Sequence, residues 1–241
     1  MNHPERQQNS LLLRLATNAV SLLTSDVLNK ATTLAVYMMV SRYLGDGTAF
    51  GQLSLGLLLL YTFQVFATVG LPTLVTREVS KRPVRACRYI LNGSITVGLS
   101  GLVATIALVG FCWLLQYDSQ TTAVISILAL GLLPYALATV TEAIFRARET
   151  MHYIALANVP ANLAKLVGAY YVLEQGWGVM GVAWLLLACR AAIILLEWVF
   201  IAWSIEWTAA RFDYRLAKKL ALWSSTFLGI DGVIAIWVSV D

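Results

Sequence analysis

The chain has 241 residues, of which 59% are hydrophobic and only 12% are charged. Its mean hydropathy is +0.73 and its formal net charge is +4. Soluble domains carry about 25% charged residues, so this chain has too little polar surface to cover a water-exposed globule. The composition indicates an integral membrane protein. It excludes a disordered segment, a disulfide-rich secreted module and a nucleic-acid-binding domain.

Apolar runs separated by charges, glycines and prolines predict an all-α protein with six membrane-spanning helices and the start of a seventh. The six are expected at about 12–44, 50–81, 88–116, 119–149, 153–173 and 179–205. Asp118 and Ser119 can cap the fourth. The seventh follows an amphipathic stretch at 214–219. We expect one six-helix lobe at 1–207, then a cytoplasmic connector and the beginning of a second lobe at 208–241.

The positions of lysine and arginine predict the orientation of these spans. Of the 17 basic residues, 13 flank spans at one end of the predicted bundle, and Arg42 alone flanks a span at the other. Short loops rich in Lys and Arg stay in the cytoplasm. The N-terminus is therefore expected in the cytoplasm, and the positive net charge is explained by topology rather than by a nucleic-acid-binding patch.

The remaining three basic residues, Lys30, Lys165 and Arg190, fall inside predicted spans. Acidic residues join them there, namely Asp26, Glu142, Glu197 and Asp231. A charge at the centre of a span costs about 2.5–3.5 kcal/mol, so these groups are expected to face one another or water.

Helical spacing groups these charges with other polar residues. Asp26 and Lys30 are i, i+4 partners, and Asn158, Asn162 and Lys165 repeat at i, i+4 and i+7. One interpretation is that the polar groups only hold helices together by interhelical hydrogen bonds. The other is a hydrated cavity in which the cations, with both asparagines, bind an anionic ligand. Asp26, Glu142 and Glu197 would then be counter-ions or sites of ion coupling.

Other motifs have a structural interpretation. The run 176–181 spells GxGxxG, but a dinucleotide fingerprint requires a preceding strand in a soluble βαβ unit. We expect a glycine turn with close helix packing. Cys87, Cys112 and Cys189 form no CxxC pair, and the two histidines lie outside any HExxH pattern. The sequence therefore predicts free thiols, no metal site and no cofactor.

Several short motifs occur together in one order along the chain. They are Asn29-Lys30-Ala31, Ser41-Arg42-Tyr43-Leu44-Gly45, Val69-Gly70-Leu71-Pro72, Thr76-Arg77-Glu78-Val79 and Phe145-Arg146-Ala147-Arg148-Glu149. In this order the chain resembles the polysaccharide-transporter, or oligosaccharide flippase, family, which includes O-antigen flippases. That family belongs to the multidrug/oligosaccharidyl-lipid/polysaccharide exporter superfamily.

The resemblance implies two six-helix lobes facing a central cleft. It also implies a transporter of the bacterial inner membrane that flips an undecaprenyl-pyrophosphate-linked oligosaccharide by alternating access. The lipid bilayer, a second lobe and a glycan polymerase or export machinery would be its partners, and no enzyme activity is expected. Because the chain stops at Asp241 within an apolar run, we expect a fragment or a truncated product.

Other functions remain open. Within the superfamily, a multidrug or peptidoglycan-precursor exporter would have the same composition. A membrane-embedded enzyme acting on polyprenyl phosphates would also need buried charges, although it should carry a larger extracytoplasmic loop. A non-transporting assembly subunit would use the buried charges as partner contacts.

Overall fold

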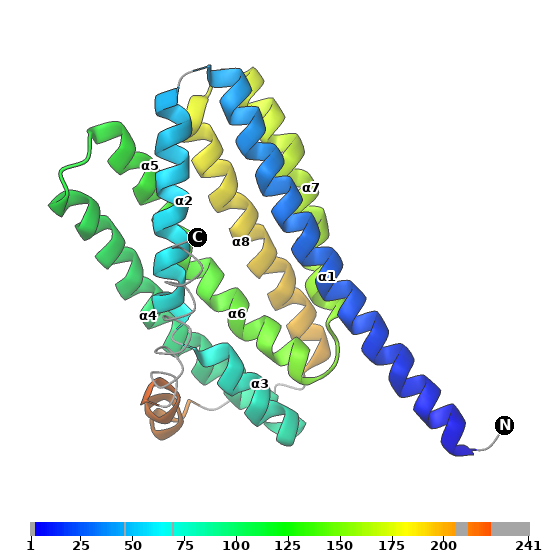
Figure 1. Cartoon of the computed structure of the whole chain (residues 1–241). Coiled ribbons are helices and arrows are strands. Elements are labelled where there is room, and N and C mark those ends of the chain that lie inside the picture. Colours follow the sequence, from blue (N-terminus) through cyan, green and yellow to red (C-terminus); the bar gives the residue numbers. More distant parts are fainter. Residues whose placement is uncertain (1–2, 46, 69, 206–211, 223–241) are drawn as a thin grey trace.

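The computed structural model describes residues 3–45, 47–68, 70–205 and 212–222, with side chains from residue 18 onward. Helices account for nearly all of these ranges, which contain no strand, and they run back and forth between the two ends of one bundle (Figure 1). The elements are α1 (His3–Leu44), α2 (Gly47–Thr68), α3 (Leu71–Lys81), the short 3-10 helix η1 (Pro83–Arg85), α4 (Ala86–Leu114), α5 (Ser119–Leu130), α6 (Leu132–Ala147), α7 (His152–Glu174) and α8 (Gly178–Ser204).

These bounds match the predicted spans closely, with three exceptions. The first helix begins at His3 rather than near residue 12. The second span is not one continuous helix, because α2 ends at Thr68 and α3 starts after Gly70. Gly70 has a φ of 66°, in the left-handed region that glycine adopts without strain. The following Leu71-Pro72 pair then starts α3, with proline in the first turn where it is tolerated.

The fourth span is also divided. The Asp118 carboxylate accepts a hydrogen bond from the backbone N–H of Thr121 at 3.1 Å, so the predicted cap starts α5. The chain turns slightly at Gly131 and continues as α6. A Cβ at Gly131 would lie 2.9 Å from the carbonyl oxygen of Leu128, so only glycine fits this turn. Pro134 follows in the first turn of α6.

The GxGxxG run forms the turn between α7 and α8 and the start of α8. Gly176 and Gly178 have φ values of 73° and 63°, which require glycine. A Cβ at Gly181 would lie 2.6 Å from both Val172 and Trp177, so α7 and α8 approach closely there. The structural interpretation of this motif is confirmed.

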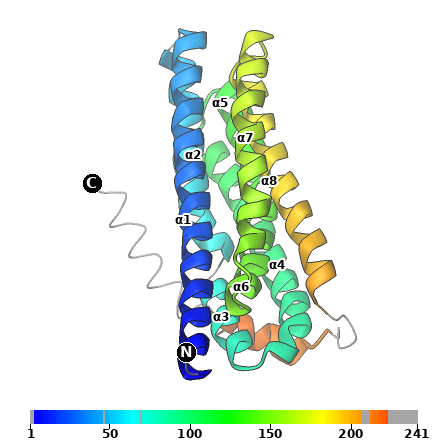
Figure 2. The same cartoon turned by 90° about the vertical axis from the view of Figure 1, so that its right-hand side faces the viewer.

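Four segments of the described chain are long and apolar enough to cross a membrane: α2, η1 with α4, α5 with α6, and α8. The other two predicted spans correspond to α1 and α7, which pack along one another (Figure 2). An all-helical membrane protein is confirmed, while the number of crossings and the cytoplasmic N-terminus stay predictions. The predicted seventh span lies outside the described residues.

Candidate functional site

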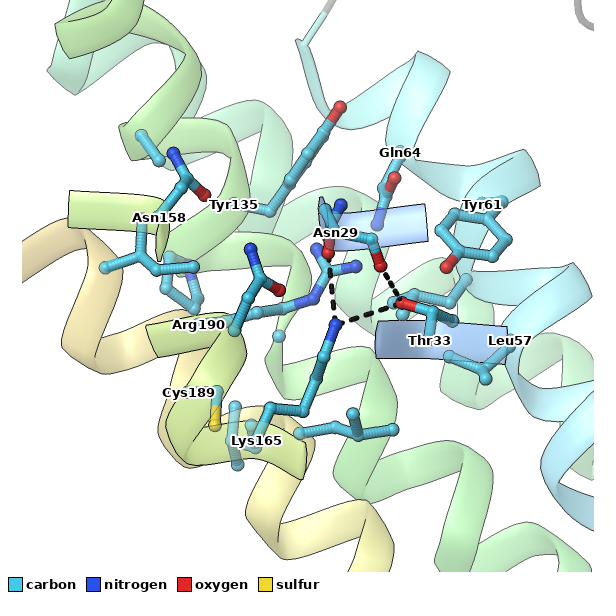
Figure 3. A pocket seen from close by; sticks show the side chains of 18 of the residues that line it. Asn29, Thr33, Leu57, Tyr61, Gln64, Tyr135, Asn158, Lys165, Cys189 and Arg190 are labelled. Atoms are coloured by element: carbon cyan, nitrogen blue, oxygen red, sulfur yellow. Dashed lines mark hydrogen bonds between the residues drawn. The ribbon is translucent and has the colours of Figure 1, made fainter. Parts of the chain in front are cut away.

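A cavity of about 400 Å³ lies between α1, α2, α6, α7 and α8. Its apolar wall consists mainly of leucine and other aliphatic residues. Its polar side chains come from five helices, the first two of the chain and the last three of the bundle (Figure 3). They are Ser25, Asp26, Asn29, Thr33, Tyr37, Tyr61, Gln64, Tyr135, Glu142, Arg146, Asn158, Asn162, Lys165, Cys189 and Arg190.

Lys165 of α7 is the most buried cation of this cavity, with 5% of its surface exposed. Its Nζ donates hydrogen bonds to Asn29 Oδ1 at 3.1 Å and to Thr33 Oγ1 at 3.0 Å. Both acceptors lie on α1, so the lysine bridges the two helices (Figure 3). Both acceptors are neutral, so the ammonium charge is solvated by dipoles but not compensated.

Arg190 of α8 is held by groups from two other helices. With its carboxamide oxygen turned toward the guanidinium, Gln64 of α2 accepts hydrogen bonds from both Nη1 and Nη2 at 2.8 Å. The guanidinium carbon lies 5.1 Å from the ring centroid of Tyr135, a cation–π distance. Gln64 is itself buried, with 7% exposed. Arg190 is therefore fixed in orientation, and its partners are neutral.

No carboxylate of the described chain forms an ion pair with Lys165 or Arg190. The ion pairs found there are Lys81–Glu78, Arg88–Asp213 and Arg146–Glu142. Glu142 and Arg146 line the cavity as a pair with a separation of 2.6 Å. Asp26 also lines it and is exposed. The cavity thus carries two cations with neutral partners, together with acidic groups of which one is already neutralised.

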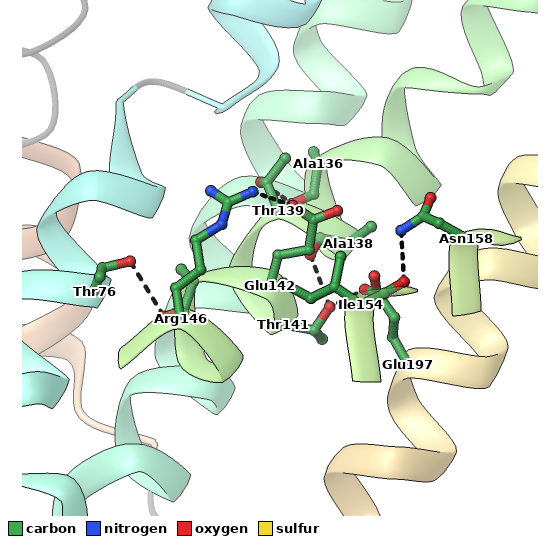
Figure 4. A network of polar contacts seen from close by, with 11 residues as sticks. Thr76, Ala136, Ala138, Thr139, Thr141, Glu142, Arg146, Ile154, Asn158 and Glu197 are labelled. Atoms are coloured by element: carbon green, nitrogen blue, oxygen red, sulfur yellow. Dashed lines mark hydrogen bonds and ion pairs between the residues drawn. The ribbon is translucent and has the colours of Figure 1, made fainter. Parts of the chain in front are cut away.

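Glu197 lies behind this cavity rather than on its wall. It is fully buried, and its Oε2 accepts a hydrogen bond from the hydroxyl of Thr141 (Figure 4). Its Oε1 has no hydrogen-bond partner among the described residues. Asn158 hydrogen-bonds to the carbonyl oxygen of Ile154 at 3.1 Å. Asn162 Oδ1 accepts from Thr32 at 3.4 Å, and its Nδ2 is buried without a partner among the described residues.

The structure brings together most of the predicted site residues but separates two of them. Lys165, Arg190, Asn158, Asn162, Asp26 and Glu142 share the cavity. Lys30 is exposed and does not line it, and Glu197 is enclosed behind it. Asp231 lies outside the described residues. Gln64 and Tyr61 were not predicted from the sequence, although a lone glutamine in the apolar segment of α2 is a usable signal.

Comparison with known proteins identifies the family. A model of the polysaccharide biosynthesis protein family matches residues 15–232. The chain belongs to this family. The search of curated proteins finds no match.

Solved structures show the fold of this family member at low sequence identity. A eukaryotic MATE transporter, AtDTX14, superposes with a TM-score of 0.69 at 12% identity, over 93% of this chain and 52% of its own. A MOP superfamily transporter from Pyrococcus furiosus superposes with a TM-score of 0.70 at 16% identity, over 89% of this chain and 52% of its own. An outward-facing MATE transporter of the MOP superfamily superposes with a TM-score of 0.70 at 15% identity, over 91% of this chain and 52% of its own. The chain thus has the fold of one transporter lobe and spans about half the length of these proteins.

Proposed function

We propose that this polysaccharide biosynthesis protein is a flippase lobe that binds the pyrophosphate of a lipid-linked oligosaccharide. One observation carries the proposal: Lys165 and Arg190 lie on the wall of one cavity and hydrogen-bond only to neutral groups of the described chain. Buried cations are stable only with a compensating partner. A phosphate group of the substrate would supply the missing negative charge.

The chemistry of the two cations suits such a substrate. A guanidinium binds phosphate oxygens in bidentate fashion, and an ammonium adds a compact charge with three donors. Gln64 orients the guanidinium before the substrate arrives, which lowers the entropy cost of binding. Asn158, Asn162 and the tyrosines of the wall would hydrogen-bond to sugar hydroxyls.

Transport would require a second lobe. With two lobes, alternate opening of the cavity to the two sides of the membrane would carry the pyrophosphate and sugars across. The undecaprenyl tail would remain in the bilayer. The protein would then act in a bacterial inner membrane with its N-terminus in the cytoplasm, and would deliver its product to a glycan polymerase or export machinery.

Asp26, Glu142 and Glu197 are the groups we propose for ion coupling or charge balance. Glu197 is the strongest of them, because its buried Oε1 has no hydrogen-bond partner among the described residues and could therefore carry a proton. Glu142 already pairs with Arg146, so uptake of a proton there would release the arginine. Such a release would link protonation to the shape of the cavity.

The test is complementation of a flippase-deficient strain with the gene that encodes both lobes. Lys165→Gln and Arg190→Gln should each reduce surface polysaccharide, at equal protein level in the membrane. Arg42→Gln is the control, because Arg42 is exposed and lies outside the cavity. Full polysaccharide levels in both cavity variants would refute the proposal.

An exporter of organic cations is the second candidate, because Asp26 and Glu142 line the same cavity. It makes the opposite prediction. A cationic drug is repelled by Lys165 and Arg190, so their replacement by glutamine would increase drug resistance of the cells. Resistance to a cationic dye, measured in the same variants, separates the two functions.

A further inference from the structure

The segment 212–222 forms a connector that is attached to the start of α4. Its residue Asp213 accepts a hydrogen bond from Arg88, and the backbone N–H of Asp213 donates to Asn92 Oδ1 at 2.9 Å. The same carboxylate caps the helix 214–222 by accepting from the backbone N–H of Arg215 at 2.9 Å. Leu220 is buried. The connector therefore has a fixed position beside α4 and α3 (Figures 1 and 2).

The outer face of this connector is basic. Arg215, Lys218 and Lys219 are exposed on it. Arg82 and Arg85, which precede α4, are exposed at the same end of the bundle. Basic residues at the end of a membrane-spanning helix attract anionic lipid headgroups, with about 1 kcal/mol for each residue near the surface.

An open pocket of about 740 Å³ lies between the connector and η1. Among the described residues, three arginines line it, Arg85, Arg88 and Arg215, against one carboxylate, that of Asp213. Arg88 Nε is buried and has no hydrogen-bond partner among the described residues. The pocket therefore offers guanidinium donors in excess of the acceptors that the described residues provide there.

Apolar side chains surround these arginines. Val84 is 91% exposed, Phe212 is 56% exposed and Tyr214 is 68% exposed, and all three line the pocket. The membrane-spanning segment that contains α4 begins at Pro83. The pocket thus lies at the end of a membrane-spanning segment, at the expected level of the lipid headgroups. Aromatic and basic side chains are enriched at this level of a membrane protein.

We propose that this pocket binds an anionic phospholipid of the adjacent leaflet. The phosphate would be held by Arg85, Arg88 and Arg215. Val84, Phe212 and Tyr214 would contact the glycerol and the first acyl carbons. The bound lipid would bridge the connector and α4, and so would add to the attachment made by Asp213. This site is separate from the central cavity and does not depend on the function proposed for it.

The experiment uses the purified full chain in a neutral detergent and measures binding of dioctanoyl phosphatidylglycerol by calorimetry. Dioctanoyl phosphatidylcholine and inorganic phosphate are the comparison ligands. Wild type should bind phosphatidylglycerol at least tenfold more tightly than either one. The double variant Arg85→Gln/Arg215→Gln should weaken phosphatidylglycerol binding by roughly thirtyfold.

The matched control is Arg77→Gln/Lys81→Gln, which removes two basic residues that are exposed at the same end but lie outside the pocket. It should leave the affinity unchanged. Val84→Asp is a second test, because a residue 91% exposed cannot disturb packing, and its carboxylate should also weaken binding. An equal loss in the control, equal binding of phosphatidylcholine, or inorganic phosphate binding as tightly as the lipid would each overturn the proposal.

Discussion

Replacement of Lys165 by glutamine separates a binding role from a structural one. Lys165 Nζ donates to Asn29 Oδ1 and Thr33 Oγ1 at 3.1 and 3.0 Å, and a glutamine amide can still donate to one of these acceptors. The variant therefore loses one hydrogen bond but also removes a buried charge that has no carboxylate partner. These effects oppose one another. We expect the unliganded protein to unfold within a few degrees of wild type.

Ligand binding should respond differently. A hydrogen bond to a charged group contributes about 1.5–3 kcal/mol, against about 0.5–1.5 kcal/mol for a neutral one. The loss of about 1–1.5 kcal/mol corresponds to roughly tenfold weaker binding of undecaprenyl pyrophosphate. Lys165→Arg retains the charge and should retain most of the affinity. Undecaprenol, which has no phosphate, should bind all variants alike.

The assay is calorimetric titration of the two-lobe protein in detergent, with thermal unfolding of the same samples. Lys30→Gln is the control, because it removes the same charge one residue from Asn29 but outside the cavity. Undiminished pyrophosphate binding in Lys165→Gln would refute the binding role. So would an equal loss in Lys30→Gln. A large fall in unfolding temperature with unchanged affinity would assign Lys165 to helix packing alone.

Three further predictions concern other parts of the lobe. Gly181→Ala should lower the free energy of unfolding by about 1–3 kcal/mol, because the added Cβ would lie 2.6 Å from two side chains. Gly110→Ala is the control, because the space around Gly110 is open and the free energy of unfolding should not fall. Hydrogen bonding to the Leu216 N–H and the Arg88 side chain lowers the pKa of Asp213, so the attachment of the connector should persist from pH 8 to 5 and be lost only as pH falls through that depressed pKa. Trypsin cleavage after Lys218, measured relative to an unstructured reference peptide at the same pH, should be constant in this range for wild type and faster at pH 7 in Asp213→Asn. Glu197→Gln should remove the dependence of transport on a proton gradient in vesicles, and unchanged dependence would exclude Glu197 as the coupling group.

The helix boundaries were predictable because local chemistry sets them. Asp118 caps α5, and the glycines at 176 and 178 have backbone angles that other residues adopt only with strain. The break at Gly70 was missed, since hydropathy remains high across it and the left-handed φ leaves no trace in an apolar run. Gly70 itself and Pro72, which follows it, were the available signals.

The candidate site was predicted in part. Helical spacing correctly placed Asn158, Asn162 and Lys165 on one cavity wall. It did not separate Lys30 from Asn29, although adjacent residues point about 100° apart on a helix. Asn29 and Thr33, four residues apart, face Lys165, while Lys30 does not line the cavity. The orientation of a helix about its own axis depends on its packing partner, which a single sequence does not specify.

The divided spans have a mechanical consequence. The half-helices α3 and α6 are joined directly, because the Thr76 hydroxyl donates to the carbonyl oxygen of Ala143 at 3.1 Å. Each half-helix starts just after a glycine, at Gly70 and Gly131, where the regular series of helical backbone hydrogen bonds is interrupted. Rotation at these two points therefore breaks few backbone hydrogen bonds. Because α6 also packs along α4 and α8, a rotation at Gly131 would have to move these contacts with it, and it would change the width of the charged end of the cavity, where Glu142 and Arg146 lie.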